Sequence, residues 1–371
     1  MEENLKKKLS TLINNLIEIK EKYSLRYMFF TLGNTKVEND YNLYFTPIRI
    51  GKNFVVTGAI VFSEFEGKKI LKEIDGIFDV IYVDSEKKSK SSNLIKIDST
   101  NYYKNINNKD DNSSKEGLFN LERLSSEIIT KSKLRYFKGN DVTVESIDKL
   151  VFNILKHKKK LIGGSNILVV GMGNIGFKIS LKLVERGANI NILSTKNLSK
   201  SIKLIESINL IKPDQTISET KIFDKNNFEL IKNLDIIILT HLSTIDENTK
   251  IYNKTSKNCI FIDVGKGCLN PDQIKFLYNK GNLCYRLDIG DSIIDFIEND
   301  IRLLSKEFTP PNLKIINNKR IISRGLLGYE DDIVVNDIEN PKFVYGICNG
   351  LGGFKKKISK KEKLFIKKLI R

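Results

Sequence analysis

The segment NILVVGMGNIG constrains the fold of this chain more than any other part of the sequence. An apolar run, 166–170, leads into Gly171, Gly173 and Gly176 at the spacing G-x-G-x-x-G, and apolar residues at helical spacing follow. A strand, a glycine turn and a helix in this order form the first unit of a Rossmann-type parallel sheet. The segment therefore predicts an α/β fold with a doubly wound parallel sheet.

The three glycines have different tasks in such a turn. Gly171 permits the tight turn, Gly173 lets the backbone approach a pyrophosphate, and Gly176 lets the helix pack closely against the strand. The N–H groups at the start of the helix, around Asn174 and Ile175, then bind the phosphates. We expect these five residues to bind a dinucleotide; a degenerate Rossmann fold that no longer binds one is the alternative.

Apolar strand patterns alternate with helical patterns over residues 165–288, which predicts a parallel sheet covered on both faces. We therefore expect a dinucleotide-binding Rossmann domain at 140–290. It is inserted into a second, discontinuous α/β domain formed by 1–139 plus 291–371, which would carry the substrate. The polar, low-complexity segment 85–116 within that domain is expected to be a mobile surface insertion or a lid.

Composition indicates a soluble, cytoplasmic protein. Hydrophobic residues make up 40% of the chain, no apolar run reaches membrane-spanning length, and the N-terminus lacks the features of a secretory signal. The net charge is +17, and residues 355–371 alone hold nine Lys/Arg and one Glu. We expect this tail to be a packed helix with a solvated lysine face; binding of nucleic acid or a membrane surface through it is the weaker alternative.

Cysteine and histidine usage argues against a metal site. The four cysteines are widely and irregularly spaced, and the chain has two histidines. We expect reduced thiols in or near the core and no bound metal.

Residues 140–290 resemble the nucleotide-binding half of the D-isomer-specific 2-hydroxyacid dehydrogenase family. The matching segments, in order, are GMGNIG, LDIIILTHLSTIDENTKIY (234–252), FIDVGKGCLNPDQIKFLYNKG (261–281) and RLDI (286–289). The resemblance implies a Rossmann fold and a nicotinamide cofactor. It also implies that Lys266 stands where the family has its substrate-binding Arg, and that Asp288 contacts the nicotinamide carboxamide, with helix capping as its alternative role.

The catalytic pattern of that family is not retained. Ser243 replaces the Pro after the loop His, and no acid–His pair follows Asp288, because the histidines are His157 and His241. We name Lys266 and His241 as the candidate catalytic residues, since a lysine can anchor a carboxylate or donate a proton and a histidine titrates near neutral pH. A solvated Lys266, and a cofactor-side or structural His241, are the alternatives.

Further candidates lie outside the Rossmann domain. Tyr44, Arg49 and Lys52 belong to strands that could face the cleft, and Arg324 is a fourth candidate. A glycine cluster at 346–353 forms either an anion-binding nest or an ordinary turn region.

These features predict an NAD(P)-dependent dehydrogenase or reductase that acts on a small anionic carbonyl or hydroxyl compound, in a homo-oligomer. The alternative is a catalytically inactive Rossmann protein that senses the cofactor or bridges partners. NADP is the expected cofactor and NAD a possible one. No Asp or Glu occurs between Glu185 and Glu206, and Ser194, Thr195 and Lys196 follow the second strand, where they suit a 2′-phosphate.

Overall fold

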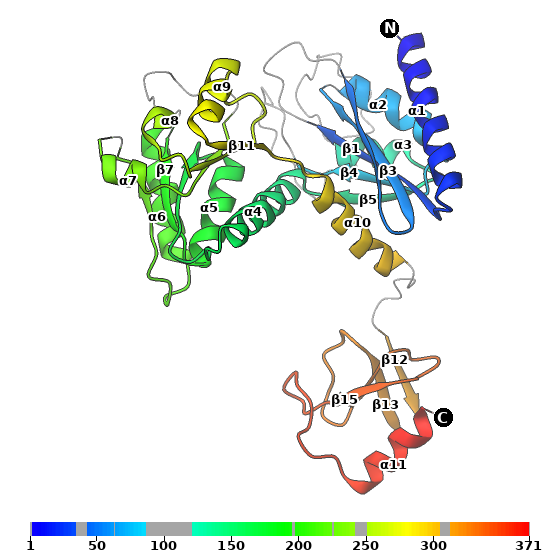
Figure 1. Ribbon diagram of the computed structural model, residues 1–371. Coiled ribbons are helices and arrows are strands. Elements are labelled where there is room, and N and C mark those ends of the chain that lie inside the picture. The colour runs from blue at the N-terminus through cyan, green and yellow to red at the C-terminus, as the bar shows by residue number, and fades with distance from the viewer. Residues whose placement is uncertain are drawn as a thin grey trace, which may run out of the picture. The chain divides into compact units, whose positions relative to one another are not determined.

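The computed structural model describes residues 2–34, 43–62, 64–86, 121–194, 197–224, 226–241, 251–304 and 312–370. The chain divides into two units, Met1–Glu298 and Asn299–Arg371 (Figure 1). Apart from Ser85 and Glu86, the polar segment predicted to be mobile (85–116) lies outside the described residues. No helix within the described ranges is long and apolar enough to cross a membrane.

A six-stranded, wholly parallel sheet forms around the glycine segment, in the order β11-β10-β9-β6-β7-β8. Its strands are β6 (Asn166–Val170), β7 (Asn189–Leu193), β8 (Thr220–Ile222), β9 (Ile236–Leu239), β10 (Ile260–Asp263) and β11 (Leu283–Arg286). Its helices are α4 (Gly139–His157), α5 (Asn174–Glu185), α6 (Leu198–Ile211), α7 (Phe228–Lys232), α8 (Ile251–Lys254) and α9 (Pro271–Lys280). The predicted Rossmann-type sheet is thereby confirmed.

Both faces of the central strands β6, β9 and β10 are buried, which is why these strands are almost entirely apolar. Along β6, Ile167 and Val169 belong to a core shared with α4, α5 and α6, whereas Leu168 and Val170 belong to a second core. The second core includes Ile231 of α7 and Leu277 of α9. Successive side chains of a strand point to opposite faces, so a strand covered on both sides shows no polar alternation.

A second sheet precedes the Rossmann sheet, in the order β2-β3-β1-β4-β5, with β2 antiparallel to β3 and the other pairs parallel. Its strands are β1 (Tyr27–Asn34), β2 (Tyr44–Ile50), β3 (Phe54–Val61), β4 (Val80–Asp84) and β5 (Lys133–Phe137). Helices α1 (Glu2–Lys22), α2 (Glu64–Ile74) and α3 (Leu121–Ile128) pack on one face.

Helix α10 (Gly290–Leu304) returns the chain to this second sheet after the Rossmann strands. Phe296 of α10 contacts Tyr82 of β4 and Phe137 of β5, with ring centroids 5.7 and 6.0 Å apart. The N–H of Lys52 also donates to the Glu298 carboxylate at 3.2 Å. The start of α10 therefore packs on the second sheet.

The rest of the C-terminal segment forms a sheet of its own, which differs from the expected grouping of 291–371 with 1–139. Its elements are β12 (Leu313–Ile316), β13 (Lys319–Ser323), β14 (Ile333–Val335), β15 (Val344–Ile347) and α11 (Lys360–Leu369). Asn317 and Asn318 both have positive φ and close a tight hairpin, so β12 pairs locally with β13. Phe365 and Leu369 of α11 pack on the core of this sheet, and no residue of α11 is fully buried.

Candidate functional site

The carboxyl ends of five Rossmann strands lie in one row across the sheet. Leu193 pairs with Val170, Val170 with Leu239, Leu239 with Asp263, and Asp263 with Arg286. Each candidate residue of the Rossmann domain follows closely on a member of this row, which we call the carboxyl-edge row. In an open α/β sheet, ligands bind outside these strand ends at the point where the strand order reverses. Here that point lies at β6, between β7 and β9.

The glycine turn has the geometry that a close approach of phosphate requires. Gly171 has φ +98°, a conformation that favours glycine, and a Cβ on Gly176 would clash with the Gly171 carbonyl oxygen. The Thr240 hydroxyl lies 3.0 Å from the carbonyl oxygens of both Val170 and Gly171 and secures the turn to β9. A Cβ on Gly173 would meet nothing within 4 Å, so space is open in front of the helix.

The start of α5 fits the diphosphate of a dinucleotide. The first turn, which includes Asn174 and Ile175, carries no acidic side chain, and its leading N–H groups have no partner within the helix. The partial positive charge at this end of the helix attracts an anion. The open space at Gly173 and the absence of a competing carboxylate are the two observations that make the residues compatible with NAD(P).

The loop predicted to bind the ribose is described only at its first residue. Ser194 follows β7, and its hydroxyl accepts a hydrogen bond from the Ser201 hydroxyl at 2.9 Å. Thr195 and Lys196 lie outside the described residues.

His241 lies beside the glycine turn, with its side chain away from solvent. The residue is 7% exposed, and neither ring nitrogen makes a hydrogen bond to a described residue. Burial lowers the pKa of His241, whereas the Val170 backbone and Asp263 oppose that shift. The Cys268 thiol donates to the His241 carbonyl at 3.0 Å. A neutral, buried imidazole at this position favours the cofactor-side or structural role over acid–base catalysis.

Lys266 lies in a turn that Asp263 holds in place. The Asp263 carboxylate accepts hydrogen bonds from the N–H groups of Lys266, Gly267 and Cys268 at 2.8, 2.9 and 3.3 Å. Lys266 itself has φ +59°, so the turn is fixed in the left-handed region. Burial lowers the pKa of the Lys266 ammonium, and Arg286 lowers it further, while Asp288 and Asp263 oppose the shift.

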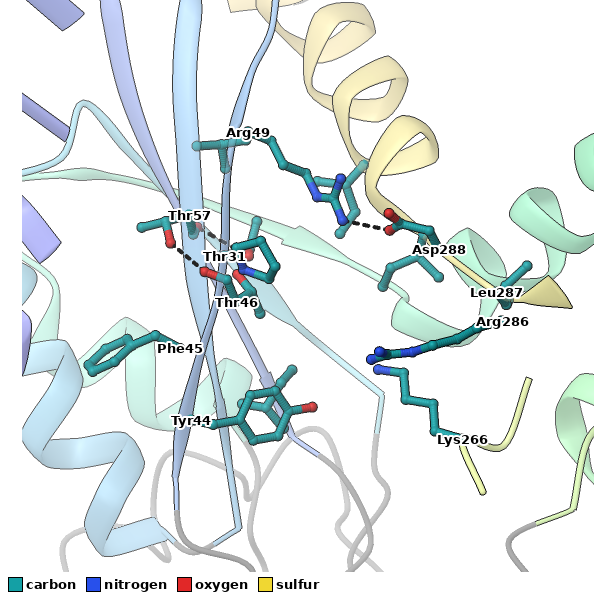
Figure 2. A pocket seen from close by; sticks show the side chains of 15 residues that line it. Thr31, Tyr44, Phe45, Thr46, Arg49, Thr57, Lys266, Arg286, Leu287 and Asp288 are labelled. Atoms are coloured by element: carbon teal, nitrogen blue, oxygen red, sulfur yellow. Dashed lines mark hydrogen bonds and ion pairs between the residues drawn. The ribbon is translucent and has the colours of Figure 1, made fainter. Parts of the chain in front are cut away.

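A cavity of about 580 Å³ within the first unit brings Lys266 together with residues of the second sheet (Figure 2). Lys266 and Arg286 extend from the Rossmann side, and Tyr44 faces them from β2. The remaining wall is largely apolar with three threonines: Thr31, Phe45, Thr46, Pro47, Arg49, Val56, Thr57, Ile60, Leu287, Asp288, Ile289 and Ile293.

Asp288 joins the two sides of this cavity. Its carboxylate lies 2.5 Å from the Arg49 guanidinium and accepts the Gly290 N–H, near the start of α10, at 2.9 Å. Burial raises the pKa of Asp288, but the Gly290 N–H and Arg49 outweigh this and lower it below its usual range. The helix-capping role is therefore present in the structure, together with an ion pair that the sequence did not predict.

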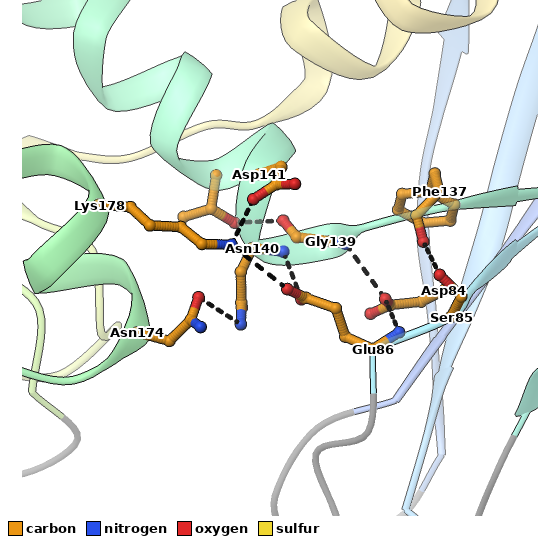
Figure 3. A network of polar contacts seen from close by, with 10 residues as sticks. Asp84, Ser85, Glu86, Phe137, Gly139, Asn140, Asp141, Asn174 and Lys178 are labelled. Atoms are coloured by element: carbon orange, nitrogen blue, oxygen red, sulfur yellow. Dashed lines mark hydrogen bonds and ion pairs between the residues drawn. The ribbon is translucent and has the colours of Figure 1, made fainter. Parts of the chain in front are cut away.

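The start of α5 also contacts the second sheet through a polar network (Figure 3). The Asn140 amide donates to the Asn174 side-chain oxygen at 3.3 Å, and the Asn140 backbone N–H donates to Glu86 at 2.8 Å. Lys178 of α5 pairs with Asp141 and lies 3.8 Å from Glu86. The helix that would hold the diphosphate is thus linked to the end of β4.

Two other sequence candidates have different surroundings. Arg324 lines a separate cavity of about 300 Å³ in the C-terminal unit. In the glycine cluster of that unit, the Asn349 side-chain oxygen accepts the N–H groups of Leu351 and Gly353. Because the chain already occupies these two donors, they are not free for an anion, which favours the turn-region interpretation.

Among the described charged residues that line the cavity, Arg286 is the one that was not predicted from the sequence. It occurs in the segment RLDI, where Asp288 drew attention as the residue that matched the family pattern. The sequence feature that could have indicated it is its position: Arg286 is a cation at the end of β11, and β11 pairs with β10, the strand that precedes Lys266.

Comparisons with known proteins show distant likeness only. No protein-family model and no curated protein matches the chain. Solved structures similar to it include the hetero-hexameric glutamate dehydrogenase of Thermus thermophilus, at 11% identity over 77% of this chain and 71% of that chain, with a TM-score of 0.39. Dipicolinate synthase A chain from Bacillus subtilis shows 14% identity over 76% and 97% of the two chains, with a TM-score of 0.34.

Phosphoglycerate oxidoreductase from Vibrio cholerae is a third such structure, at 11% identity over 70% and 83% of the two chains, with a TM-score of 0.30. Likenesses at these identities and TM-scores carry no argument about activity.

Proposed function

We propose that this protein is an NAD(P)-dependent oxidoreductase that acts on a small, anionic carbonyl or hydroxyl compound. The observation that carries the proposal is the carboxyl-edge row, which has an unobstructed glycine turn at one strand and two cations beside a cavity at others. Neighbouring strands lie about 4.8 Å apart, so the ends of β6 and β10 are separated by about 10 Å. An extended dinucleotide with its diphosphate at Gly173 can reach the cavity over that distance.

The cofactor, when bound, supplies or accepts a hydride. Lys266 is the proposed contact to the substrate: its ammonium either anchors the anionic group, or donates a proton to the carbonyl oxygen during reduction and accepts it back during oxidation. A lowered pKa favours the second role, because a proton donor works best when its pKa lies closer to the working pH. The apolar residues around the cavity limit access of water to the reacting carbon.

NADP is the proposed cofactor. Two hydroxyl groups and an ammonium, from Ser194, Thr195 and Lys196, follow β7, and no carboxylate in that loop opposes a 2′-phosphate. We expect NADPH to bind at least about tenfold more tightly than NADH, which corresponds to about 1.4 kcal/mol. Lys196→Ala should remove most of that preference, whereas Lys203→Ala, on the exposed face of α6, should leave it unchanged. Equal affinities in the wild type would contradict this part of the proposal.

A cofactor sensor without catalytic activity is the second candidate. The observation in its favour is that both ring nitrogens of His241 are buried and that no described residue lining the cavity is a histidine. Such a protein would bind NADPH and transfer no hydride.

Steady-state assays separate the two candidates. Purified protein is mixed with NADPH and a panel of 2-oxo acids, imino acids and sugar-acid carbonyls, and absorbance of the reduced cofactor is followed. We expect turnover with at least one substrate, a large loss of turnover in Lys266→Ala, and a small change of cofactor affinity in the same variant. Tight NADPH binding without turnover over the whole panel would favour the sensor.

A further inference from the structure

Lys266 and Arg286 lie together at the boundary between two cavities. They line the cavity of about 580 Å³ described above, and they also line a second cavity of about 390 Å³ formed by Leu269, Ile274, Tyr278, Cys284 and Tyr285 with Asp263 and Gly267. Among the described residues, no other side chain lines both cavities. Figure 2 shows the ammonium and the guanidinium extending toward the same point.

The carboxylates near these two cations are already engaged. Asp263, which pairs with Arg286 in strand register, accepts the three backbone N–H groups that fix the turn at Lys266. Asp288 forms its ion pair with Arg49. Neither Lys266 nor Arg286 makes an ion pair with any described residue, although the charges of Asp288 and Asp263 still act on Lys266.

Two like charges held side by side destabilise one another, although solvent screens the repulsion here because both residues are exposed. Arg286 acts in this way on Lys266, because it lowers the pKa of the ammonium. A bound anion reverses the effect, since its charge attracts both cations at once. The arrangement is therefore more favourable with an anion present than without one.

Tyr44 adds a third hydrogen-bond donor to the same place. Burial raises the pKa of the Tyr44 phenol, although Arg286 opposes that shift, so the hydroxyl keeps its proton at neutral pH. An ammonium, a guanidinium and a phenol together offer more donors than one carboxylate can accept. A singly charged group would place only one negative charge beside the two cations.

We propose that Lys266, Arg286 and Tyr44 form a subsite for a doubly charged anionic portion of the substrate, either a pair of neighbouring carboxylates or a phosphate. This inference deepens the proposed function and rests on it, because it names the charge of the substrate. A dianion neutralises both cations and receives bidentate hydrogen bonds from the guanidinium, which a lysine alone does not supply. Arg286 thereby selects dianionic over monoanionic substrates.

Calorimetric titration of the full-length protein at constant ionic strength tests this subsite without any cofactor. The probes are malonate as a dicarboxylate, inorganic phosphate, and acetate as a monoanion. We expect malonate or phosphate to bind at least about tenfold more tightly than acetate. The stronger of the two identifies which kind of dianion the site prefers.

The variants Arg286→Gln and Lys266→Gln should each reduce dianion affinity at least tenfold and remove the preference over acetate. Lys203→Gln removes one exposed lysine of α6 and is the matched control, which should bind like the wild type. Thermal unfolding of each variant shows whether the fold is kept. Equal affinities for malonate, phosphate and acetate in the wild type, an absence of binding, or an unchanged Arg286→Gln would each overturn the proposal.

Titration of the same variants with NADPH separates this inference from the proposed function. We expect Arg286→Gln to bind NADPH as the wild type does. Dianion binding without NADPH binding would contradict the proposed oxidoreductase function and support the anion subsite. NADPH-dependent turnover without a preference for dianions would contradict the subsite and support the oxidoreductase function.

Discussion

The Arg49 guanidinium lies 2.5 Å from the Asp288 carboxylate, and this ion pair joins β2 of the second sheet to the segment that follows β11. The guanidinium also packs against Gly290, where a Cβ would clash with it. The pair forms part of the wall of the large cavity. It therefore helps to set the width of that cavity, because its two members come from the two sheets that the cavity separates.

Breaking this ion pair should change substrate binding more than stability. The Asp288 side chain is 67% exposed, so we expect Arg49→Gln to lower the free energy of unfolding by at most about 1 kcal/mol. We expect it to raise KM several-fold through a less ordered cavity wall. Denaturant unfolding and steady-state kinetics measure the two effects.

Asp288→Asn is the companion variant, because an asparagine oxygen still accepts the Gly290 N–H. If Asp288 acts through Arg49, both variants should raise KM to a similar extent and leave NADPH affinity unchanged. A loss of NADPH affinity in Asp288→Asn alone would instead support the nicotinamide contact that the sequence resemblance implies.

Two glycine substitutions should separate folding from ligand binding. Gly176→Ala places a methyl group against the Gly171 carbonyl, so we expect a loss of about 1–3 kcal/mol in the free energy of unfolding. Gly173→Ala adds the same methyl group where nothing lies within 4 Å, and φ at Gly173 is −84°, so stability should change by less than about 1 kcal/mol. Similar destabilisation in both variants would show that the turn differs from the one described.

Lys266→Gly should remove function without loss of stability. Lys266 has φ +59°, which glycine adopts at little cost and most other residues adopt at about 1 kcal/mol or more. The gain offsets the greater flexibility of glycine in the unfolded chain. We expect the midpoint of thermal unfolding of Lys266→Gly to lie within a few degrees of the wild type, with dianion binding reduced at least tenfold. Lys266→Val places a β-branched residue at the same positive φ, so its unfolding midpoint should be lower than that of Lys266→Gly.

Binding of malonate, which is a dianion throughout the range tested, should weaken as pH rises through the lowered pKa of Lys266. Below that pKa the ammonium is charged and attracts the anion, and above it the attraction is lost. Asp288 stays ionised over the range from about pH 7 to pH 10, because its pKa is lowered. Tyr44 keeps its proton over most of that range because burial raises its pKa.

Arg286→Gln provides the control for this pH dependence. Removing the guanidinium removes one of the causes that lower the pKa of Lys266, so the remaining weak binding should be lost at a higher pH than in the wild type. Calorimetric dissociation constants measured across the range give both midpoints. A midpoint that stays in place, or moves to lower pH, would contradict the placement of Arg286 beside Lys266.

The Rossmann sheet could be predicted from the sequence because its signals are local. The glycine turn, the strand before it and the helix after it lie within about one βα unit, and each residue type has a steric reason at its position. The separate C-terminal sheet could not be predicted in the same way. Its strands β12–β15 could equally have extended the sheet of 1–139, and only tertiary pairing decides between the two.

The sequence could predict which strand ends carry the residues of the candidate site, but not which of their side chains contact one another. Lys266 and Asp288 follow their strands as expected, yet the partner of Asp288 is 239 residues away in the sequence. Arg286 becomes significant only when register places it beside the turn of Lys266. The sequence does not reveal that the His241 imidazole is buried, which bears on the choice between an acid–base role and a cofactor-side or structural one.

Fluorescence titration with NADPH, followed in the wild type and in Gly173→Ala, tests whether the carboxyl-edge row binds a dinucleotide. We expect saturable binding by the wild type and at least about tenfold weaker binding by Gly173→Ala, whose thermal unfolding stays close to that of the wild type. Absence of NADPH binding by the folded wild-type protein, or equal affinity in the two proteins, would contradict it.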